Sequence, residues 1–433
     1  MRKIVVLLLV LTFCWITPVK ADDIEELKSL VRQLMKENQA LAERVKALEK
    51  KLEAYESRAQ APSPAPQAGP ASGGNWYERL NVGLSVASVV QDVVDAERVD
   101  GNGNVTGHGD RGYAAVTVDL ELSTDFTQKD RAKVLLEMGS GHNPEDEIAS
   151  FSGIIDEALS MVPVETDDGD VRISEAWYEH DFLFRHVKTR VRFGKIDVTT
   201  DFDNNEYAND ETSQFFSPVF VNNIAVEWPA YAFGSMVWFE TEKLDFGLGY
   251  ADADGNWDDI LDYPFLIAQV TWRPDFLGRA GNYRVYAWYN GDKHQEILGD
   301  DTDETGYGLG LSFDQEITKS LGVFLRYGWQ NEDVYPYDHA LSFGFSLAGN
   351  AWGRPDDVFG LGFGVAFLSD DYEEKLAREG FDTEDEYHLE AYYSFKVNQY
   401  LTLTPDLQWT DNPAGYEDRD DFWVFSVRGT WEF

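Results

Sequence analysis

The sequence contains almost no cysteine. Cys14 is the only one among 433 residues, which excludes an internal disulfide framework. Cys14 also lies in an N-terminal segment that we expect to be removed on export. The mature chain is therefore predicted to have no thiol chemistry.

Basic residues are scarce as well. The chain has 36 Lys and Arg against 78 Asp and Glu, a formal net charge of −42. Such a surface repels nucleic acid and attracts cations. High acidity is also typical of disordered chains, but a 14% content of Phe, Trp and Tyr indicates a folded protein. We therefore expect most of the acidic residues in solvated loops.

Long apolar runs and catalytic motifs are missing too. After the first 21 residues, no stretch approaches the roughly 18 apolar residues that a transmembrane helix needs. The seven histidines show no metal-ligand spacing, and no G-x-S-x-G nucleophile motif occurs. We expect neither a metal nor another cofactor, and the sequence does not indicate an enzyme.

Residues 1–21 have the pattern of a secretory signal peptide. Arg2 and Lys3 precede an apolar run at residues 4–16, and Val19, Lys20 and Ala21 follow as a cleavage region. The run is shorter than the roughly 20 residues of a membrane-spanning helix. We expect cleavage after Ala21.

Residues 22–58 are predicted to form an α-helical coiled coil. Apolar side chains recur there at spacings of three and four, through about five heptads. Ile and Val that alternate with Leu in the core favour a coiled coil of two helices. Leu30, Met35 and Ala42 widen the apolar stripe, which favours three helices. We expect a homo-oligomer, with a trimer favoured. Residues 59–75, rich in Pro, Ala, Gly and Ser, are predicted to be a linker.

Residues 76–433 are organised on a period of two. About sixteen segments of roughly ten residues alternate between apolar and polar side chains, with Asp-, Asn- and Gly-rich breaks between them. A large soluble sandwich or solenoid and an outer-membrane barrel would both give this alternation. The last segment, 422–433, keeps it up to a terminal Phe433, as the closing strand of a barrel would.

Aromatic residues favour the barrel. Tyr and Trp gather near the ends of the segments, as interfacial girdles do. Examples are Tyr286, Trp288, Tyr289, Tyr327, Trp329, Tyr392 and Tyr393. The predicted fold is therefore all-β: a transmembrane antiparallel β-barrel of about 16 strands, preceded by the coiled coil.

From about residue 173 the chain resembles the OprB-type carbohydrate-selective porins. The resemblance lies in ordered blocks such as AWYEHDFL (176–183), VRFGKIDVTTDFDNNEYANDETSQFFSPVFVNN (191–223), GNYRVYAWYNG (281–291), LGVFLRYGWQ (321–330) and LTLTPDLQWTDNPAG (401–415). It implies a barrel in the outer membrane of a Gram-negative bacterium, among outer-membrane lipid and lipopolysaccharide, through which sugars and other small solutes diffuse. The coiled coil would then stand in the periplasm, where it would contact the cell wall.

Strand parity selects candidate pore residues. In segment 187–196, Lys188, Arg190 and Arg192 share one face. A base against lipid costs about 2–4 kcal/mol near the midplane, so this face is expected to line a water-filled lumen. The same rule turns Glu175 and Trp177 inward in the preceding segment, although Ile173 then falls with the acids.

Parity adds three residues from later strands: Arg284 and Trp288 in segment 283–290, and Arg326 in segment 322–330. The predicted pore-lining and solute-binding set is Glu175, Trp177, Lys188, Arg190, Arg192, Arg284, Trp288 and Arg326. Such groups would hold the hydroxyls and C–H faces of sugars weakly enough for release. Alternatively, the charges only solvate the wall and brace one another across strands.

Two long inserts bear on the size of the pore. Residues 197–223, rich in Asn, Asp and Glu, are predicted either to fold into the lumen or to form an extracellular loop. Residues 143–162 show helical spacing and are predicted to hold a short helix that narrows the pore.

Two functions fit these patterns. One is a porin for passive diffusion of carbohydrates and other small solutes. The other, suggested by the acidity, is a general or cation-preferring porin whose coiled coil tethers the outer membrane to the cell wall.

Overall fold

The structure is a computed structural model that describes residues 79–99, 105–142, 144–155, 171–184, 187–276 and 278–433. The chain divides into two units, Met1–Gly73 and Gly74–Phe433. All of the described residues belong to the second unit. The predicted signal peptide and coiled coil, and nearly all of the predicted linker, fall in the first unit, and all three lie outside the described residues.

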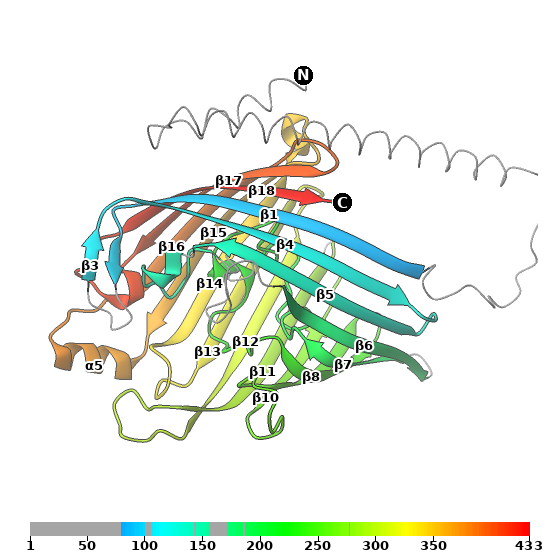
Figure 1. Cartoon of the computed structure of the whole chain (residues 1–433), viewed down its shortest axis with the longest axis horizontal. Helices are drawn as coiled ribbons and strands as arrows, with labels where there is room; N and C mark the ends of the chain where they lie inside the picture. Colours follow the sequence, from blue (N-terminus) through cyan, green and yellow to red (C-terminus); the bar gives the residue numbers. More distant parts are fainter. Residues whose placement is uncertain (1–78, 100–104, 143, 156–170, 185–186, 277) are drawn as a thin grey trace, which may run out of the picture. The chain divides into compact units, whose positions relative to one another are not determined.

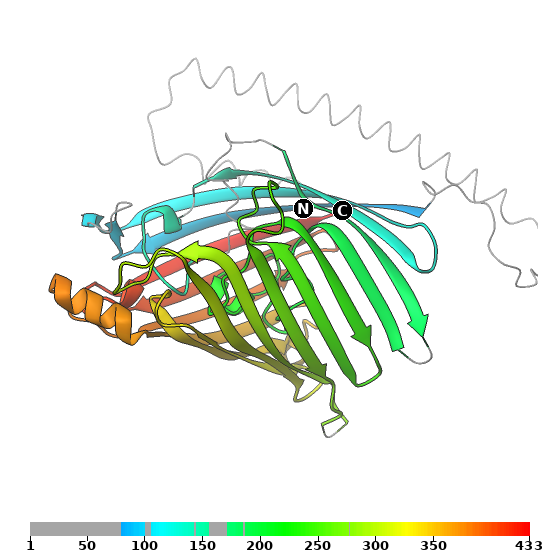
Figure 2. The same cartoon turned by 90° about the horizontal axis from the view of Figure 1, so that it is seen from below.

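Sixteen strands of the described part form one closed antiparallel barrel (Figure 1 and Figure 2). β1 closes the ring because it pairs with both β18 and β4. The barrel strands are β1 (Leu80–Val94), β4 (Arg111–Asp125), β5 (Asp130–Gly141), β6 (Arg172–Phe184), β7 (Val187–Ile196), β8 (Ala232–Glu240), β9 (Leu244–Asp252), β10 (Pro264–Trp272), β11 (Gly281–His294), β12 (Glu304–Glu316), β13 (Leu321–Gln330), β14 (Tyr337–Ala348), β15 (Val358–Leu368), β16 (Glu386–Lys396), β17 (Leu401–Asp411) and β18 (Phe422–Glu432). The predicted barrel and its number of strands are confirmed.

The two ends of the barrel differ in the length of their connections. Leu84 and Phe433 exchange backbone hydrogen bonds, so the start of β1 and the end of β18 share one end. Short turns such as 126–129, 241–243 and 317–320 lie at this end, and long loops lie at the other. Outer-membrane barrels have short periplasmic turns and long extracellular loops. We therefore call these the inner and the outer end.

Small elements sit in these connections. A hairpin of β2 (Glu97–Val99) and β3 (Val105–His108) extends from the outer end. The short helices are η2 (Pro144–Asp146), α4 (Pro218–Val221), η3 (Gly349–Trp352), α5 (Asp370–Glu379) and η4 (Pro413–Gly415). Within the ranges that the structure describes, no helix is long and apolar enough to cross a membrane.

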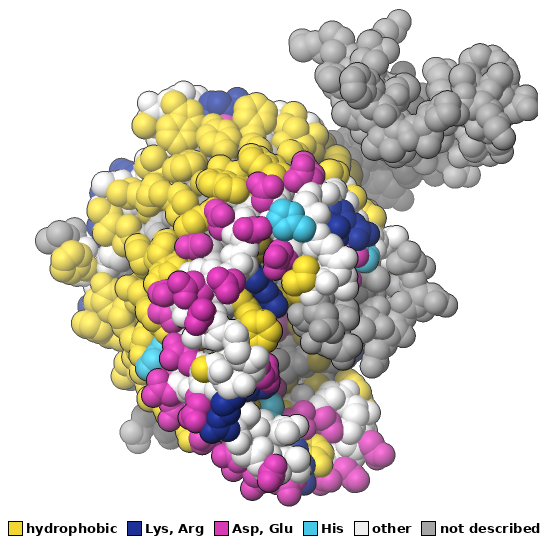
Figure 3. All heavy atoms as spheres, turned by 90° about the vertical axis from the view of Figure 1, so that its left-hand side faces the viewer, with side chains coloured by type: hydrophobic (Ala, Val, Ile, Leu, Met, Phe, Trp, Pro, Cys, Tyr) yellow, Lys and Arg dark blue, Asp and Glu magenta, His cyan; other side chains and the backbone are white. Residues whose placement is uncertain are grey.

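The barrel wall has two faces, which β18 shows clearly. Phe425 and Val427 are 52% and 51% exposed on the outside, whereas Ser426 and Arg428 between them are buried inside. An outward Arg would meet hydrocarbon at a cost of about 2–4 kcal/mol, and the alternation avoids this. Figure 3, which looks onto the outer end, shows the apolar flank next to loops that are rich in Asp and Glu.

Aromatic pairs mark both rims of the apolar band. At the inner end, Trp272 and Tyr283 are 5.7 Å apart between ring centroids on adjacent strands. At the outer end, Trp409 and Trp423 are 6.4 Å apart. The girdle prediction was wrong for three of its examples, because Tyr286, Trp288 and Tyr392 are buried on the inner side. Parity, and not nearness to a strand end, decides which side an aromatic residue faces.

Candidate pore constriction

Residues 197–231, between β7 and β8, fold into the barrel; we call this segment the lumenal loop. Its Phe202, Phe215 and Phe220 have no exposed surface. Phe202 packs against Trp238 on the inner wall, with 4.9 Å between ring centroids. The structure therefore places 197–223 inside the lumen and excludes the alternative of an extracellular loop.

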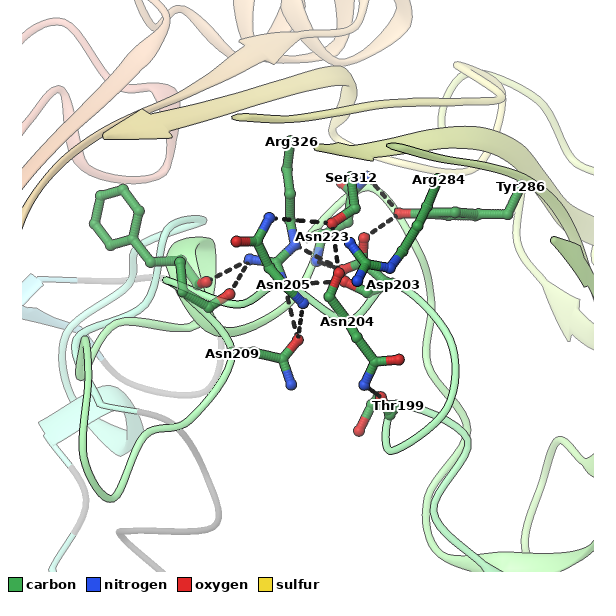
Figure 4. A network of polar contacts seen from close by, with 12 residues as sticks. Thr199, Asp203, Asn204, Asn205, Asn209, Asn223, Arg284, Tyr286, Ser312 and Arg326 are labelled. Atoms are coloured by element: carbon green, nitrogen blue, oxygen red, sulfur yellow. Dashed lines mark hydrogen bonds and ion pairs between the residues drawn. The ribbon is translucent and has the colours of Figure 1, made fainter. Parts of the chain in front are cut away.

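A buried polar network ties the lumenal loop to the wall (Figure 4). Asp203 accepts a hydrogen bond from the Tyr286 hydroxyl at 2.8 Å and lies 2.9 Å from the Arg326 guanidinium. The Asn223 backbone N–H donates to the same carboxylate at 2.8 Å. Arg326 also donates to the carbonyls of Ala208 and Phe220, at 2.5 and 2.6 Å. The Asp203–Arg326 pair thus holds both the entering and the returning half of the loop. The two charges neutralise each other and are hydrogen-bonded, as burial requires.

Backbone carbonyls of the loop are bound at a second place on the wall. Arg428 on β18 donates to the carbonyls of Glu211 and Gln214. Thr430 donates to the carbonyl of Thr212 at 2.9 Å. These contacts satisfy an irregular backbone that would otherwise lose its hydrogen bonds inside the barrel.

The apolar side of the loop packs on β13 and β16. Phe215 lies 5.4 Å from Phe324 and 4.9 Å from Tyr392, both inner-wall residues. Val219 and Phe220 of α4 belong to the same buried cluster. Large rings in such offset and edge-on arrangements add to the area that they bury, so this half of the lumen is filled with protein.

Two carboxylates on β16 hold both inserts. Glu390 accepts from the backbone N–H groups of Phe216 and Ser217, at 2.6 and 3.0 Å. Glu386 accepts from those of Phe151 and Ser152, at 2.9 and 2.6 Å. These bonds satisfy backbone N–H groups that are buried inside the barrel, and they fix the two inserts side by side.

The predicted helix in 143–162 is absent from the residues of that insert that the structure describes. Pro144–Asp146 form a 3-10 turn, and the chain then continues irregularly to residue 155. Ile148 and Ile154 instead pack on inner-wall residues that include Tyr113 and Val424. Their spacing reflects contacts with the barrel wall and not a helical face. Residues 156–162 lie outside the described residues.

The opposite wall, formed by β5 to β8, carries paired charges. Arg190 lies 2.6 Å from Asp201 and 3.0 Å from Glu240. Arg131 on β5 lies 2.8 Å from Glu179 and 2.9 Å from Asp181. The side chains of Arg131 and Lys188 are each 40% exposed, although both strands turn these residues inward. These groups therefore face water inside the barrel.

An indole lies within this charged wall. The Arg192 guanidinium stands 4.1 Å from the Trp177 ring centroid, in cation–π range. Trp177 donates to Glu175 at 2.7 Å, and Glu175 also pairs with Lys133 at 2.8 Å. Hydrogen-bond donors, acceptors and an aromatic ring thus lie close together on this wall. We call the inner face of β5 to β8, together with Asp201 of the lumenal loop, the charged wall.

The predicted site residues divide into two groups. Glu175, Trp177, Lys188, Arg190 and Arg192 lie together on the charged wall. The other three, although inward-facing, lie under the lumenal loop: Arg284, Trp288 and Arg326 are 8%, 3% and 1% exposed. Parity predicts the side of the wall that a residue faces but not what covers it. On the charged wall, Glu175 and Arg192 are buried to a similar degree, at 4% and 6% exposed. Arg326 and Trp288 differ from them by their contacts with the loop, since Arg326 donates to loop carbonyls and Trp288 belongs to a buried cluster with Phe202.

A β-bulge explains why Ile173 broke the parity of its strand. Leu135 pairs with Glu175 but Leu136 pairs with Ile173, so Ser174 is the extra residue. The shift leaves Glu175 inside and Ile173 51% exposed outside. Arg172 beyond the bulge lies 3.5 Å from the inward Glu137.

Sequence reasoning missed several members of the charged wall. Arg131 and Lys133 alternate in β5 as the bases of β7 do, and the same parity rule would have selected them. Asp201 belongs to a loop, and Glu240 is the last residue of its strand. No alternation marks either one, so only the fold brings them to the site.

Two buried polar residues on β16, His388 and Glu390, have structural partners. His388 is buried and shares a hydrogen bond with Thr410 at 2.9 Å, and the neighbouring Glu390 holds backbone N–H groups. Among the described residues, no group of three or more His, Cys, Asp or Glu could hold a metal ion. The barrel points to a channel and not to an enzyme.

The lumenal loop borders two hollows. The outer vestibule, of about 660 Å³, is lined by residues such as Arg172, Asn222, Trp228 and Tyr337. The inner vestibule, of about 910 Å³, is lined by the loop and by the turns at the inner end. Each hollow lies at the end of the barrel for which it is named.

Curated relatives match about half of the chain. A protein of Aquifex aeolicus described as uncharacterized is 28% identical over 222 residues, 51% of this chain and 58% of its own length. Porin B of Pseudomonas aeruginosa is 22% identical over 313 residues, 59% of this chain and 67% of its own length. Porin AaxA of Chlamydia abortus is 23% identical over 247 residues, 55% of this chain and 52% of its own length. The chain thus spans between about half and two thirds of these relatives.

A solved structure shares the fold. The high-pH structure of Pseudomonas putida OprB superposes with a TM-score of 0.69 at 17% identity, over 82% of this chain and 95% of that one. Residues 116–433 match the family described as carbohydrate-selective porin, OprB family. The chain therefore belongs to the OprB family of carbohydrate-selective porins, which are outer-membrane β-barrel proteins of Gram-negative bacteria.

Proposed function

We propose that the chain is a porin for the passive diffusion of carbohydrates and other small neutral solutes. The observation that carries this is that five bases on the charged wall each pair with at least one acid; they are Arg131, Lys133, Lys188, Arg190 and Arg192. Arg192, for example, lies 2.9 Å from Glu179 and 2.6 Å from Asp201. Such a wall offers donors and acceptors together and favours neither sign of ion strongly.

The paired wall suits hydroxyl-rich solutes. A sugar hydroxyl both donates and accepts, so it can exchange for water next to an ion pair without separating the charges. Glu175, Trp177, Lys188, Arg190 and Arg192 are the proposed solute-contacting residues. Because each charged group among them already has a partner in the chain, solute binding stays weak, as passage through a pore requires.

Liposome swelling tests this proposal. Vesicles that contain the folded chain are placed in isosmotic glucose, and swelling follows if glucose enters. We expect swelling with glucose and slower swelling with a trisaccharide, because a passage bordered by the lumenal loop discriminates by size. Absence of glucose-dependent swelling from protein that still conducts small ions would overturn the carbohydrate proposal.

A general or cation-preferring pore is the second candidate, and the outer loops favour it. The α5 loop, residues 369–385, has eight acids and two bases, and loop 253–263 has four acids and no base. Desolvation, and then the nearby carboxylates of Asp371 and Asp370, raise the pKa of Glu332 in a third loop. Figure 3 shows acidic side chains across this end. Reversal potentials in a salt gradient separate the candidates, since only the second predicts a large cation bias.

We also propose that residues 22–58 make the chain a homo-oligomer, with a trimer favoured, and contact the cell wall. The support is the heptad pattern alone. Light scattering of the full chain and of a form that lacks residues 22–74 tests the assembly. If both forms had the same oligomeric state, residues 22–58 would not be what assembles the oligomer.

A further inference from the structure

The outer vestibule combines aromatic and polar groups in one hollow. Its volume of about 660 Å³ is typical of small-molecule sites. Trp228 and Tyr231 come from the returning limb of the lumenal loop, and Tyr337 begins β14. A solute that enters from outside meets this hollow before it reaches the inner vestibule.

The polar ends of two of these aromatic residues are already bound. Trp228 donates its indole N–H to the Asn223 carbonyl at 3.1 Å. Tyr337 donates its hydroxyl to the Ile224 carbonyl at 2.9 Å. Both side chains are therefore held in place, and their ring carbons remain to line the hollow.

The basic groups at the hollow have compensating partners. The Arg172 guanidinium lies 3.5 Å from Glu137 and 5.8 Å from the Tyr231 ring centroid. Lys195 donates to the Ile173 carbonyl at 2.7 Å. Asp197, with its own negative charge, lines the same hollow. The site thus has no excess of positive charge that would select an anion.

One acceptor at this hollow has no partner within the chain. The side-chain oxygen of Asn222 is buried and makes no hydrogen bond, although Asn222 lines the hollow. A buried acceptor without a donor is costly, so such groups usually meet water or a ligand. A hydroxyl group of a bound solute would supply the missing donor.

The inner vestibule is different in kind. It is larger, about 910 Å³, but Tyr392 is the single aromatic residue among those that line it. Charged side chains such as Glu206, Arg354, Asp356 and Lys396 dominate its lining. It offers no group of rings on which the C–H face of a solute could pack.

We propose that the outer vestibule is a weak binding site for the ring of a neutral sugar. Trp228 and Tyr231 would pack on its C–H face, and Asn222 would accept from a hydroxyl. The inference deepens the proposed function and rests on it. It makes capture asymmetric, because these two rings lie at the outer end and the inner vestibule has no such pair.

The test compares glucose with sorbitol, an acyclic hexitol that has hydroxyls but no flat ring face. Each is added to the outer side of the full chain in a planar bilayer, and the reduction in ion current is titrated. We expect glucose to reduce the current saturably and sorbitol much less. Trp228→Ala should raise the half-saturating glucose concentration roughly tenfold, since one stacking surface is lost. Trp228→Phe, which keeps a ring, should shift it much less.

Two controls keep the test decisive. The heat-dependent shift in electrophoretic mobility verifies that each variant is folded, and Tyr231→Ala provides a second variant if Trp228→Ala does not fold. Equal effects of glucose and sorbitol on the unsubstituted chain, or an unchanged half-saturation in the folded alanine variants, would overturn the site. If glucose entered liposomes in either case, the proposed function would stand. A chain that neither admits glucose nor responds to it would overturn both.

Discussion

At the scale of single residues, Asp203 and Arg326 show how charge is kept inside the protein. Neither side chain is more than 1% exposed. Desolvation of such a pair is costly, and only mutual attraction and further hydrogen bonds offset it. Arg326 meets this condition with backbone carbonyls from both limbs of the lumenal loop. The pair therefore fixes the position of the loop and is not free to bind solute.

Arg326→Met should destabilise the barrel by about 3–5 kcal/mol, because it leaves the Asp203 carboxylate buried without its partner. Urea unfolding in detergent measures this. The double variant Asp203→Asn with Arg326→Met should lose less than Arg326→Met alone, since no charge is then stranded. Equal losses for the two would show that the charge pair does not hold the loop.

Lys188→Gln should make the passage more cation-selective, because the Lys188 side chain is 40% exposed inside the barrel. It removes one positive charge and leaves Asp181 and Glu240 in place. Two unit charges in contact in water interact by about 1 kcal/mol, which corresponds to a factor of roughly five. We therefore expect the cation-to-anion permeability ratio to rise roughly fivefold. Reversal potentials across a salt gradient measure the ratio. The control is Arg284→Gln, because Arg284 and its partner Asp314 are 10% and 3% exposed, and it should leave the ratio unchanged.

At the scale of elements, the lumenal loop decides how much of the barrel is open. Its apolar face packs on β13 and β16, and its polar face is tied to β11, β13 and β18. The loop also packs on Trp238 of β8, whereas the side chains of Arg131 on β5 and Lys188 on β7 remain in water. A rigid loop on one side of the lumen implies a constriction of fixed size.

Replacing residues 204–222 by a short Gly-Ser linker should raise single-channel conductance several-fold, because the filling of the lumen is removed. The linker can be short, since the Asn223 N–H reaches the Asp203 carboxylate at 2.8 Å. Conductance of the folded variant in planar bilayers is the measurement. An unchanged conductance would show that ions do not pass beside this loop.

The strands could be predicted from the sequence, whereas the filling of the lumen could not. Lys188, Arg190 and Arg192 alternate in one strand, and the cost of charge in lipid makes their side predictable from local sequence alone. The cover over Arg326 depends on Asp203 and Phe220, which are 123 and 106 residues away in the chain. Contacts between residues so far apart in the chain cannot be predicted from a local sequence pattern. The same reason explains why Ile148 and Ile154 were wrongly assigned to a helix.

At the scale of the whole barrel, charge is distributed unequally between the two ends. The outer loops 253–263 and 369–385 together have twelve acids against two bases, whereas the inner turns 126–129, 241–243 and 317–320 have three bases against one acid. A mouth lined by one sign of charge concentrates counter-ions. The barrel is therefore expected to attract cations from outside more strongly than from inside.

Magnesium ions added at the outer side should reduce the cation preference more than the same concentration added at the inner side, because they screen the acidic loops. Bilayer recordings with the orientation of the protein established measure this difference. A response that does not depend on side would contradict the unequal distribution of charge.

The central claim is that one parity of each strand faces a water-filled passage and the other faces lipid. Cysteine introduced at Lys188 or at Thr189 and exposed to a charged, membrane-impermeant thiol reagent tests it most directly. The account predicts that modification changes the current through Lys188→Cys and leaves Thr189→Cys unaffected. Reaction at Thr189→Cys alone, or no effect on a conducting Lys188→Cys channel, would contradict it.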